Sequence, residues 1–314
     1  GLVPAACRNQ SAELSRYFSR FVRVFGVHIF ASASSEDWFL QHVARGMAKF
    51  LDQDEDGRPD HPRVVEELVR HKAAMVLTKT EQEYDRGIAR IADRMGTRLD
   101  HGVIKNDHPY WNCSVTNVWV IAEEFEEETP HDSTEPYGQV PPGPPWGRDD
   151  AVWEEVFHLI SHIGYGCAWP EIWGFDADAK NPYGYPGSIP ESNISRALDA
   201  MMGDCGAAYN GTQTQRHESC SYYYQDETCW YPCLVNEYLN SVHLGHIGAR
   251  DWQCRGSKAE YAFCTHRLSE ARDPVGAGLG GDPSLPQQVP SGHYAPSDSA
   301  WVRSTKLPGA AGES

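Results

Sequence analysis

Residues 149–166 read DDAVWEEVFHLISHIGYG, and the interpretation of the whole chain starts from this stretch. In an α-helix, Glu154, His158 and His162 follow one another at four-residue spacing, so one carboxylate and two imidazoles share a stripe. The other positions are largely apolar, which predicts a buried helix whose glutamate and histidines need partners. A divalent metal is one such partner. Ordinary hydrogen bonds to carboxylates or backbone carbonyls are the alternative, and both interpretations stay open.

A third protein ligand for such a metal would come from a later helix. Residues 234–246 read LVNEYLNSVHLGH, and Glu237 lies there among apolar neighbours, where an unpaired carboxylate would be costly. A salt bridge or hydrogen bond in the core is the alternative for Glu237, and His243 and His246 are weaker ligand candidates. The predicted zinc ligands are His158, His162 and Glu237.

The same helix supplies candidates for acid–base chemistry. Glu154 and Glu155 precede the first histidine by one turn, and metal-assisted hydrolysis needs a carboxylate beside the metal-bound water. The predicted catalytic residues are Glu155 or Glu154 as general base and Tyr165 as the group that polarises a substrate carbonyl, with a residue of Tyr222 to Tyr224 as the alternative to Tyr165.

Residues 52–60, DQDEDGRPD, form a second motif. Aspartate at positions one, three and five with glycine at position six is typical of a loop that wraps oxygen ligands around calcium. Position twelve of an EF-hand is Arg63 here instead of glutamate, so either Glu66 or Glu67 substitutes or the site is weaker. A solvated acidic turn is the alternative. The predicted calcium ligands are Asp52, Asp54, Asp56, Arg58 (through its carbonyl) and Asp60.

Composition narrows the class of protein. The 314 residues include 44 acidic and 27 basic side chains, a formal charge of −17 that argues against nucleic acid and anionic membrane surfaces as partners. No apolar run is long enough to span a membrane, and a start at Gly1 rather than Met suggests a removed leader. The nine cysteines predict disulfides, with one thiol left free or available for a bridge to another chain. Together with four glycosylation sequons, they predict a secreted glycoprotein. The sequons begin at Asn9, Asn112, Asn193 and Asn210.

The expected fold is α+β, with a small sheet covered by helices, a disulfide-stabilised helical second half and an extended Pro/Gly-rich C-terminal tail. We expect one globular domain over residues 1–272 and an extended or disordered tail over 273–314. Expected strands cover 22–31, 73–78 and 117–122, and expected helices cover 11–23, 35–51, 62–72, 81–95, 149–166, 193–202, 234–246 and 257–271.

Two resemblances follow from these motifs. Two helical histidines and a downstream glutamate resemble the zincin metalloproteases, although the zincin H-E-x-x-H motif is absent because Leu159 follows His158. The segments VFGVHI (24–29), DxDxDG (52–57) and EExxHLIxHxGY (154–165) resemble a group of secreted bacterial and eukaryotic proteins of unassigned activity. The second resemblance implies that about residues 22–250 form one unit.

These observations lead to two functional hypotheses. The first is a secreted metal-binding glycoprotein with a zincin-like hydrolase centre, acting on peptides or proteins, plus a structural calcium. The second is a non-enzymatic extracellular matrix, surface or assembly protein, stabilised by calcium and disulfides, whose partners are neighbouring chains. A copper or iron redox centre is a third interpretation, because imidazole suits several metals. An open coordination position beside a cleft would favour the first hypothesis.

Overall fold

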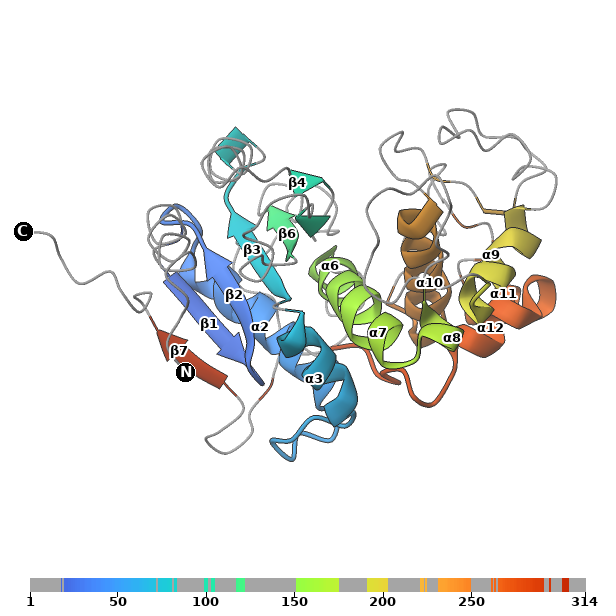
Figure 1. The fold of residues 1–314 in the computed structure, drawn as a ribbon, viewed down its shortest axis with the longest axis horizontal. Coiled ribbons are helices and arrows are strands. Elements are labelled where there is room, and N and C mark those ends of the chain that lie inside the picture. The colour runs from blue at the N-terminus through green and yellow to red at the C-terminus, as the bar shows by residue number, and fades with distance from the viewer. Residues whose placement is uncertain are drawn as a thin grey trace, which may run out of the picture.

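The computed structural model places a sheet at one side of the molecule and a group of helices at the other, with α6 between them (Figure 1). It describes residues 18, 20–71, 73–80, 82–83, 99–100, 103–104, 117–121, 151–174, 191–202, 221–222, 224, 231–249, 261, 263, 265–290, 294 and 301–304.

The main sheet has five strands in the order β6-β3-β2-β1-β7. Strands β2, β3 and β6 are parallel, whereas β1 is antiparallel to both β2 and β7. A separate antiparallel pair joins β4 and β5. The expected small sheet with helices is therefore present. The strands are β1 (Arg20–Val24), β2 (Val27–Ala31), β3 (Ala74–Thr78), β4 (Leu99–Asp100), β5 (Val103–Ile104), β6 (Asn117–Ile121) and β7 (Trp301–Ser304).

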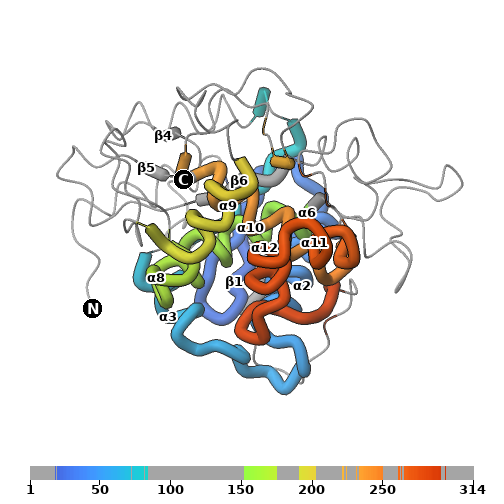
Figure 2. Tube along the Cα trace, turned by 90° about the vertical axis from the view of Figure 1, so that its right-hand side faces the viewer, coloured from blue at the N-terminus to red at the C-terminus, as the bar shows by residue number. Residues whose placement is uncertain are grey.

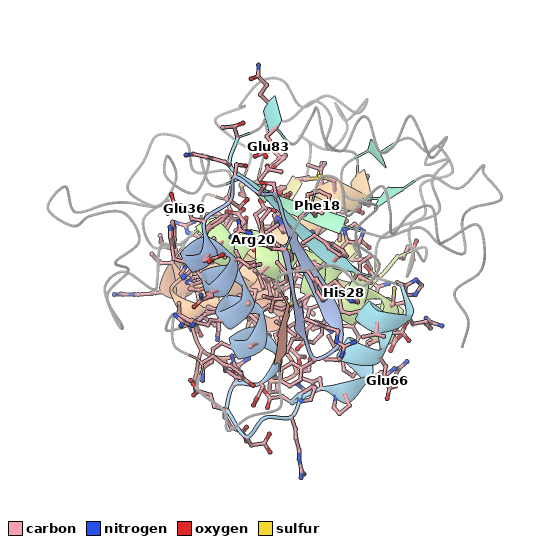
Figure 3. The ribbon with its side chains drawn as sticks, turned by 90° about the vertical axis from the view of Figure 1, so that its left-hand side faces the viewer. Phe18, Arg20, His28, Glu36, Glu66 and Glu83 are labelled. Atoms are coloured by element: carbon pink, nitrogen blue, oxygen red, sulfur yellow. The ribbon has the colours of Figure 1, made fainter. Side chains whose placement is uncertain are left out.

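The single strand expected over 22–31 is wrong, because a tight turn divides it. Phe25 has φ +48° and Gly26 has φ +97°, and Val24 pairs with Val27 in antiparallel register. Positive φ at both central residues is what a two-residue hairpin turn requires, and glycine supplies it at low cost. The apolar run thus becomes two neighbouring strands, which Figure 3 shows between α2 and α3 with Arg20 and His28 labelled.

Two helices connect the parallel strands β2 and β3, which need a crossover connection. They are α2 (Asp37–Leu51) and α3 (Pro62–Arg70), close to the helices expected at 35–51 and 62–72. Helix α2 packs against β1, β2 and α6. The contact with α6 is close at Gly46, where an added Cβ would lie 2.1 Å from Trp153 Cζ3.

The central stretch is not a uniform α-helix. It begins as α6 (Ala151–Leu159), widens into the π-helix η3 (Ile160–Tyr165), and ends as the short helices α7 (Gly166–Ala168) and α8 (Pro170–Trp173). A Cβ at Gly164 would lie 2.6 Å from Val64 Cγ1, so η3 and α3 approach closely there. Short π-helical turns occur frequently at functional sites.

Helix α10 forms the second half of the helical part. It packs against α6 on one side and against α9, α11 and α12 on the other (Figure 1). Figure 2 views the molecule from that side and shows α11 next to α12. Cys233 on α10 is disulfide-bonded, and its partner lies outside the described residues. These helices are α9 (Asn193–Met202), α10 (Tyr231–Ile247), α11 (His266–Arg272) and α12 (Pro274–Gly280).

The extended or disordered tail expected over 273–314 is wrong for much of its length. Asp273 caps helix α12, its Oδ1 accepting from the Gly276 backbone N–H at 2.9 Å. A Cβ at Gly280 would lie 2.6 Å from the Val242 carbonyl oxygen, so glycine lets α12 pack against the α10 backbone. Further on, β7 joins the sheet beside β1. Within α12, proline stands at the start of the helix, and Gly276 and Gly280 allow close packing.

One hydrophobic cluster connects both halves, running from Val22 to Tyr294. It contains side chains of α2, α6 and α10 together with strands of the sheet, so the described residues share one core. None of the described helices combines the length and apolar character needed to cross a membrane.

Candidate metal centre

Helices α6 and α10 face each other through a ladder of polar pairs. Asn240 Nδ2 donates to Glu154 Oε1 at 2.8 Å, and Ser161 Oγ donates to Asn236 Oδ1 at 2.8 Å. Between these pairs, His158 Nε2 lies 3.1 Å from Glu237 Oε2. Residue numbers rise on α10 as they fall on the central helix, so the two helices are antiparallel. The apolar side chains that the sequence predicted on these two helices surround the ladder. The polar side chains of the ladder are therefore buried between the helices.

His158 lies between two carboxylates. Its Nδ1 is 3.5 Å from Glu155 Oε2, and its Nε2 faces Glu237, whose side chain is 10 % exposed. Burial opposes charge on this imidazole, but Glu237 and Glu155 outweigh it and raise the pKa of His158 well above its ordinary value. The two glutamates therefore favour the protonated form of His158 when no metal is bound.

The central pair also has the spacing of metal ligands. His158 Nε2 and Glu237 Oε2 are both buried, and although 3.1 Å apart they do not meet hydrogen-bond geometry. Two tetrahedral ligands at about 2.0–2.1 Å from zinc lie about 3.3 Å from each other. Ligand atoms of Glu154, His158 and Glu237 all lie within 4.8 Å of one another. The residue types, the spacing and the pair of buried atoms without hydrogen bonds fit a divalent metal.

Among the described residues, the predicted ligand His162 does not belong to this group of candidate metal ligands. It lies within the π-helical turn η3, which changes the four-residue alignment expected of a regular α-helix. Burial and the neighbouring charge of His158 lower the pKa of His162 to about 3, so its imidazole is neutral. Glu154, which was predicted to act as a base, is the third member of the candidate ligand group, where the sequence predicted His162.

The structure does not support the role predicted for Tyr165. Its hydroxyl donates to the Ser284 carbonyl oxygen at 2.7 Å, and its ring packs against Trp169 and Trp173. Burial, with Asp60 and Asp282 nearby, raises the pKa of Tyr165 above its ordinary value. The hydroxyl proton is committed to a backbone carbonyl, so Tyr165 ties the central helix to the C-terminal segment.

The two weaker histidine candidates have other partners. His243 Nδ1 lies 2.8 Å from the Gly280 carbonyl oxygen, and its ring stacks on Phe157 at 4.4 Å between centroids. Burial lowers the pKa of His243 to about 4, in spite of the bond to Gly280. His246 lies beside His266 on α11. Within the described residues, neither histidine joins the group on α6 and α10.

The acidic loop brings part of the predicted calcium set together. Ligand oxygens of Asp52, Asp54 and Asp60 lie within 4.8 Å of one another. Asp56 is not in that group of described residues, and its Oδ1 accepts from the Arg58 backbone N–H at 2.8 Å. Burial, together with the charges of Asp54 and Asp52, raises the pKa of Asp60 despite its bond from the Gln53 backbone.

The two predicted substitutes for the missing EF-hand glutamate do not join the loop. Glu67 pairs with Arg70 and His71 on its own helix, and Figure 3 shows Glu66 on the same helix α3. Neither glutamate belongs to the group of acidic oxygens found among the described residues. Any calcium held here would thus lack the bidentate ligand of an EF-hand.

The loop has a partner that the sequence did not indicate. The Tyr294 hydroxyl donates to Asp52 Oδ2, and the Gln287 backbone N–H donates to Gln53 Oε1 at 2.7 Å. Lys49 contributes an ion pair with Glu55 at 2.9 Å. The loop is therefore held in shape by the C-terminal segment and by α2.

Two further predictions concern surface chemistry. Asn193 is exposed at the start of α9, and its Oδ1 accepts from Arg196 Nη2 at 2.6 Å. Asn9, Asn112 and Asn210 lie outside the described residues. Cys167 is a free cysteine, and burial raises the pKa of its thiol to about 12, with Glu67 adding to the effect. A thiol in that state is a poor nucleophile.

Comparisons with family models, curated proteins and solved structures find no match for this chain. The two resemblances drawn from the motifs therefore stay predictions.

Proposed function

We propose that this protein is a secreted metalloprotein whose α6–α10 centre binds one divalent transition metal and supports hydrolysis of peptides or proteins. Glu154, His158 and Glu237 would hold the metal. The observation that carries the proposal is the buried pair of His158 Nε2 and Glu237 Oε2, which lie 3.1 Å apart with a ligand oxygen of Glu154 within 4.8 Å of both.

Zinc is the metal that we propose first. One imidazole and two carboxylates suit zinc, iron and manganese, and zinc alone among these has no redox chemistry to control outside the cell. When bound with an open position, zinc lowers the pKa of a coordinated water and so supplies a nucleophile at neutral pH. On metal binding His158 would release its proton to the solvent, and Glu154 and Glu237 would balance the positive charge of the metal.

Glu155 has two candidate roles. Its carboxylate lies 3.5 Å from His158 Nδ1, the position from which a second carboxylate orients a metal-binding histidine. Its side chain is 34 % exposed, so it can also exchange protons with water as a general base. A Glu155→Gln variant separates these roles. A fall in metal affinity of about 10–100-fold would indicate orientation, whereas retained affinity with lost turnover would indicate the base.

We also propose a structural calcium at Asp52, Asp54 and Asp60. Three carboxylates that share one small volume repel one another, and a cation relieves that repulsion. Asp52 is fully buried, and Asp54 and Asp60 are exposed, so an ion can enter from the solvent side.

Elemental analysis of the natively purified protein, before any chelator is added, tests the metal content. We expect about one zinc per chain that depends on this centre, with calcium present as well. The variants His158→Ala and Glu237→Gln should lose this zinc, His162→Ala should retain it, and the exposed His266→Ala is the matched control. The metal centre would be contradicted by two results together. These are a native protein without any transition metal, and a His158→Ala variant that binds added zinc with the same affinity as the wild type.

Catalysis is tested separately from binding. The two central side chains are only 8 % and 10 % exposed, an observation that favours the second candidate, an extracellular structural protein with a closed metal site. Zinc-loaded protein is incubated with denatured protein substrates, and new amino termini are counted over time. Turnover that vanishes in Glu237→Gln supports the hydrolase. Zinc binding without turnover on any substrate supports the structural role.

A further inference from the structure

A second cluster of metal-ligating side chains lies where α3 meets α7, away from the α6–α10 ladder. Glu67 and His71 are four residues apart at the end of α3, and Glu67 Oε2 lies 3.5 Å from His71 Nε2. Cys167 on α7 completes the group, and the three ligand atoms lie within 4.8 Å of one another.

The local structure explains why these residues meet. Helix α3 ends at Arg70 with His71 as its C-cap, which places Glu67 and His71 on one face of the last turn. The π-helix η3 and then α7 pack against this helix, and the close approach at Gly164 brings the following cysteine to the same face. All three side chains are partly exposed, so the cluster is open to solvent.

The cluster already has an internal charge pattern. Arg70 Nη2 pairs with Glu67 Oε2 and lies 3.2 Å from His71 Nε2, so the guanidinium stands beside the three ligand atoms. Burial and this arginine lower the pKa of His71, and Glu67 opposes the shift. The ion pair of Glu67 and Arg70 does not by itself explain why a free thiol and an imidazole lie within 4.8 Å of the same carboxylate.

We propose that Glu67, His71 and Cys167 form a second site for a zinc-class divalent ion, independent of the site on α6 and α10. One thiolate, one imidazole and one carboxylate are a ligand set that selects zinc over magnesium or calcium. The Cys167 thiol releases its proton to the solvent buffer as the sulfur–metal bond forms. Arg70 moves off Glu67 at the same time, and a water or an external ligand fills the fourth position.

Cobalt(II) titration of the full-length protein tests this proposal, because thiolate ligation of cobalt gives a near-ultraviolet charge-transfer band that imidazole and carboxylate ligands do not give. The α6–α10 centre contains no cysteine, so it cannot contribute to this band. We expect the band in the wild type and its loss in Cys167→Ser. His71→Gln and Glu67→Gln should weaken cobalt binding at this band by at least about 100-fold.

Two controls separate this site from its surroundings. His266 and Glu270 form an i, i+4 pair at 3.1 Å like that of Glu67 and His71 but are not in a described metal-ligand group, so His266→Gln should leave the band unchanged. Glu237→Gln should also leave it unchanged, whatever happens to the first centre. The proposal is overturned if saturating cobalt gives no charge-transfer band, or if the band persists at the same affinity in His71→Gln and Glu67→Gln.

Discussion

His243 should make the folded protein progressively less stable as the pH falls below neutral. The imidazole is fully buried, Nδ1 faces the Gly280 carbonyl oxygen at 2.8 Å, and the ring stacks on Phe157. Burial lowers its pKa from 6.5 to about 4. Between these values the unfolded chain binds a proton that the folded chain does not, so stability rises with pH and is lost on acidification.

The size of this effect follows from the two pKa values. At 1.36 kcal/mol for each tenfold difference in proton affinity, His243 costs about 2 kcal/mol of folding stability at pH 5 and about 3 kcal/mol at pH 4. His162, with a pKa lowered to about 3, acts in the same direction, so the wild type alone cannot isolate His243. A His243→Asn variant can isolate it, because its side-chain amide still reaches the carbonyl of Gly280 but does not titrate.

The assay is guanidinium unfolding of wild type and His243→Asn at several pH values from 4 to 7. At pH 7 the variant should be less stable, because the stack on Phe157 is lost. That difference should shrink by about 3 kcal/mol on going to pH 4. Leu244→Val, the next buried position on α10, is the control and should show a loss that does not vary with pH. A constant difference between wild type and His243→Asn across the range would refute the reasoning.

Two further predictions concern packing and the acidic loop. Gly46→Ala should destabilise the protein by about 1–3 kcal/mol, because its Cβ would lie 2.1 Å from Trp153 Cζ3. Gly278→Ala on α12 is the control, because an added Cβ at Gly278 would meet nothing within 4 Å, and it should be neutral or stabilising by up to about 1 kcal/mol. Equal losses of stability in the two variants, measured by urea unfolding, would count against the close contact at Gly46. Tyr294→Phe should cost about 1–2 kcal/mol in chelator, because Asp52 loses its buried donor. The loss of stability should be smaller when calcium is present. If thermal unfolding shows the same loss with and without calcium, cation binding by the loop is contradicted.

The helices were predictable where local signals agree with packing. Residues 37–51 carry an apolar stripe after an acidic first turn, and residues 62–70 begin with a proline at the first helical position. The strand over 22–31 was not predictable from its apolar pattern alone. Its turn at Phe25 and Gly26 depends on positive φ at a phenylalanine, which hydrophobic periodicity cannot reveal.

Part of the candidate site was likewise predictable from the sequence, and part was not. Pairing of His158 with Glu237 could be expected, because a glutamate and a histidine on two apolar helices need partners when buried. The exchange of His162 for Glu154 could not, since it depends on the register between α6 and α10 and on the π-helical turn. Asn236 and Asn240 were missed, yet their spacing with Glu237 on an otherwise apolar helix is a signal that could have found the ladder.

The C-terminal segment, which the sequence predicted to be extended or disordered, connects the parts that carry the candidate sites. Gly280 lets α12 lie against Val242 of α10, so α12 supports the helix that carries Glu237. The Tyr294 hydroxyl then holds Asp52 of the acidic loop, and β7 closes the edge of the sheet beside β1. Because one segment contacts α10, the acidic loop and the sheet in turn, the helices that carry the candidate centre and the acidic loop are physically linked within one core.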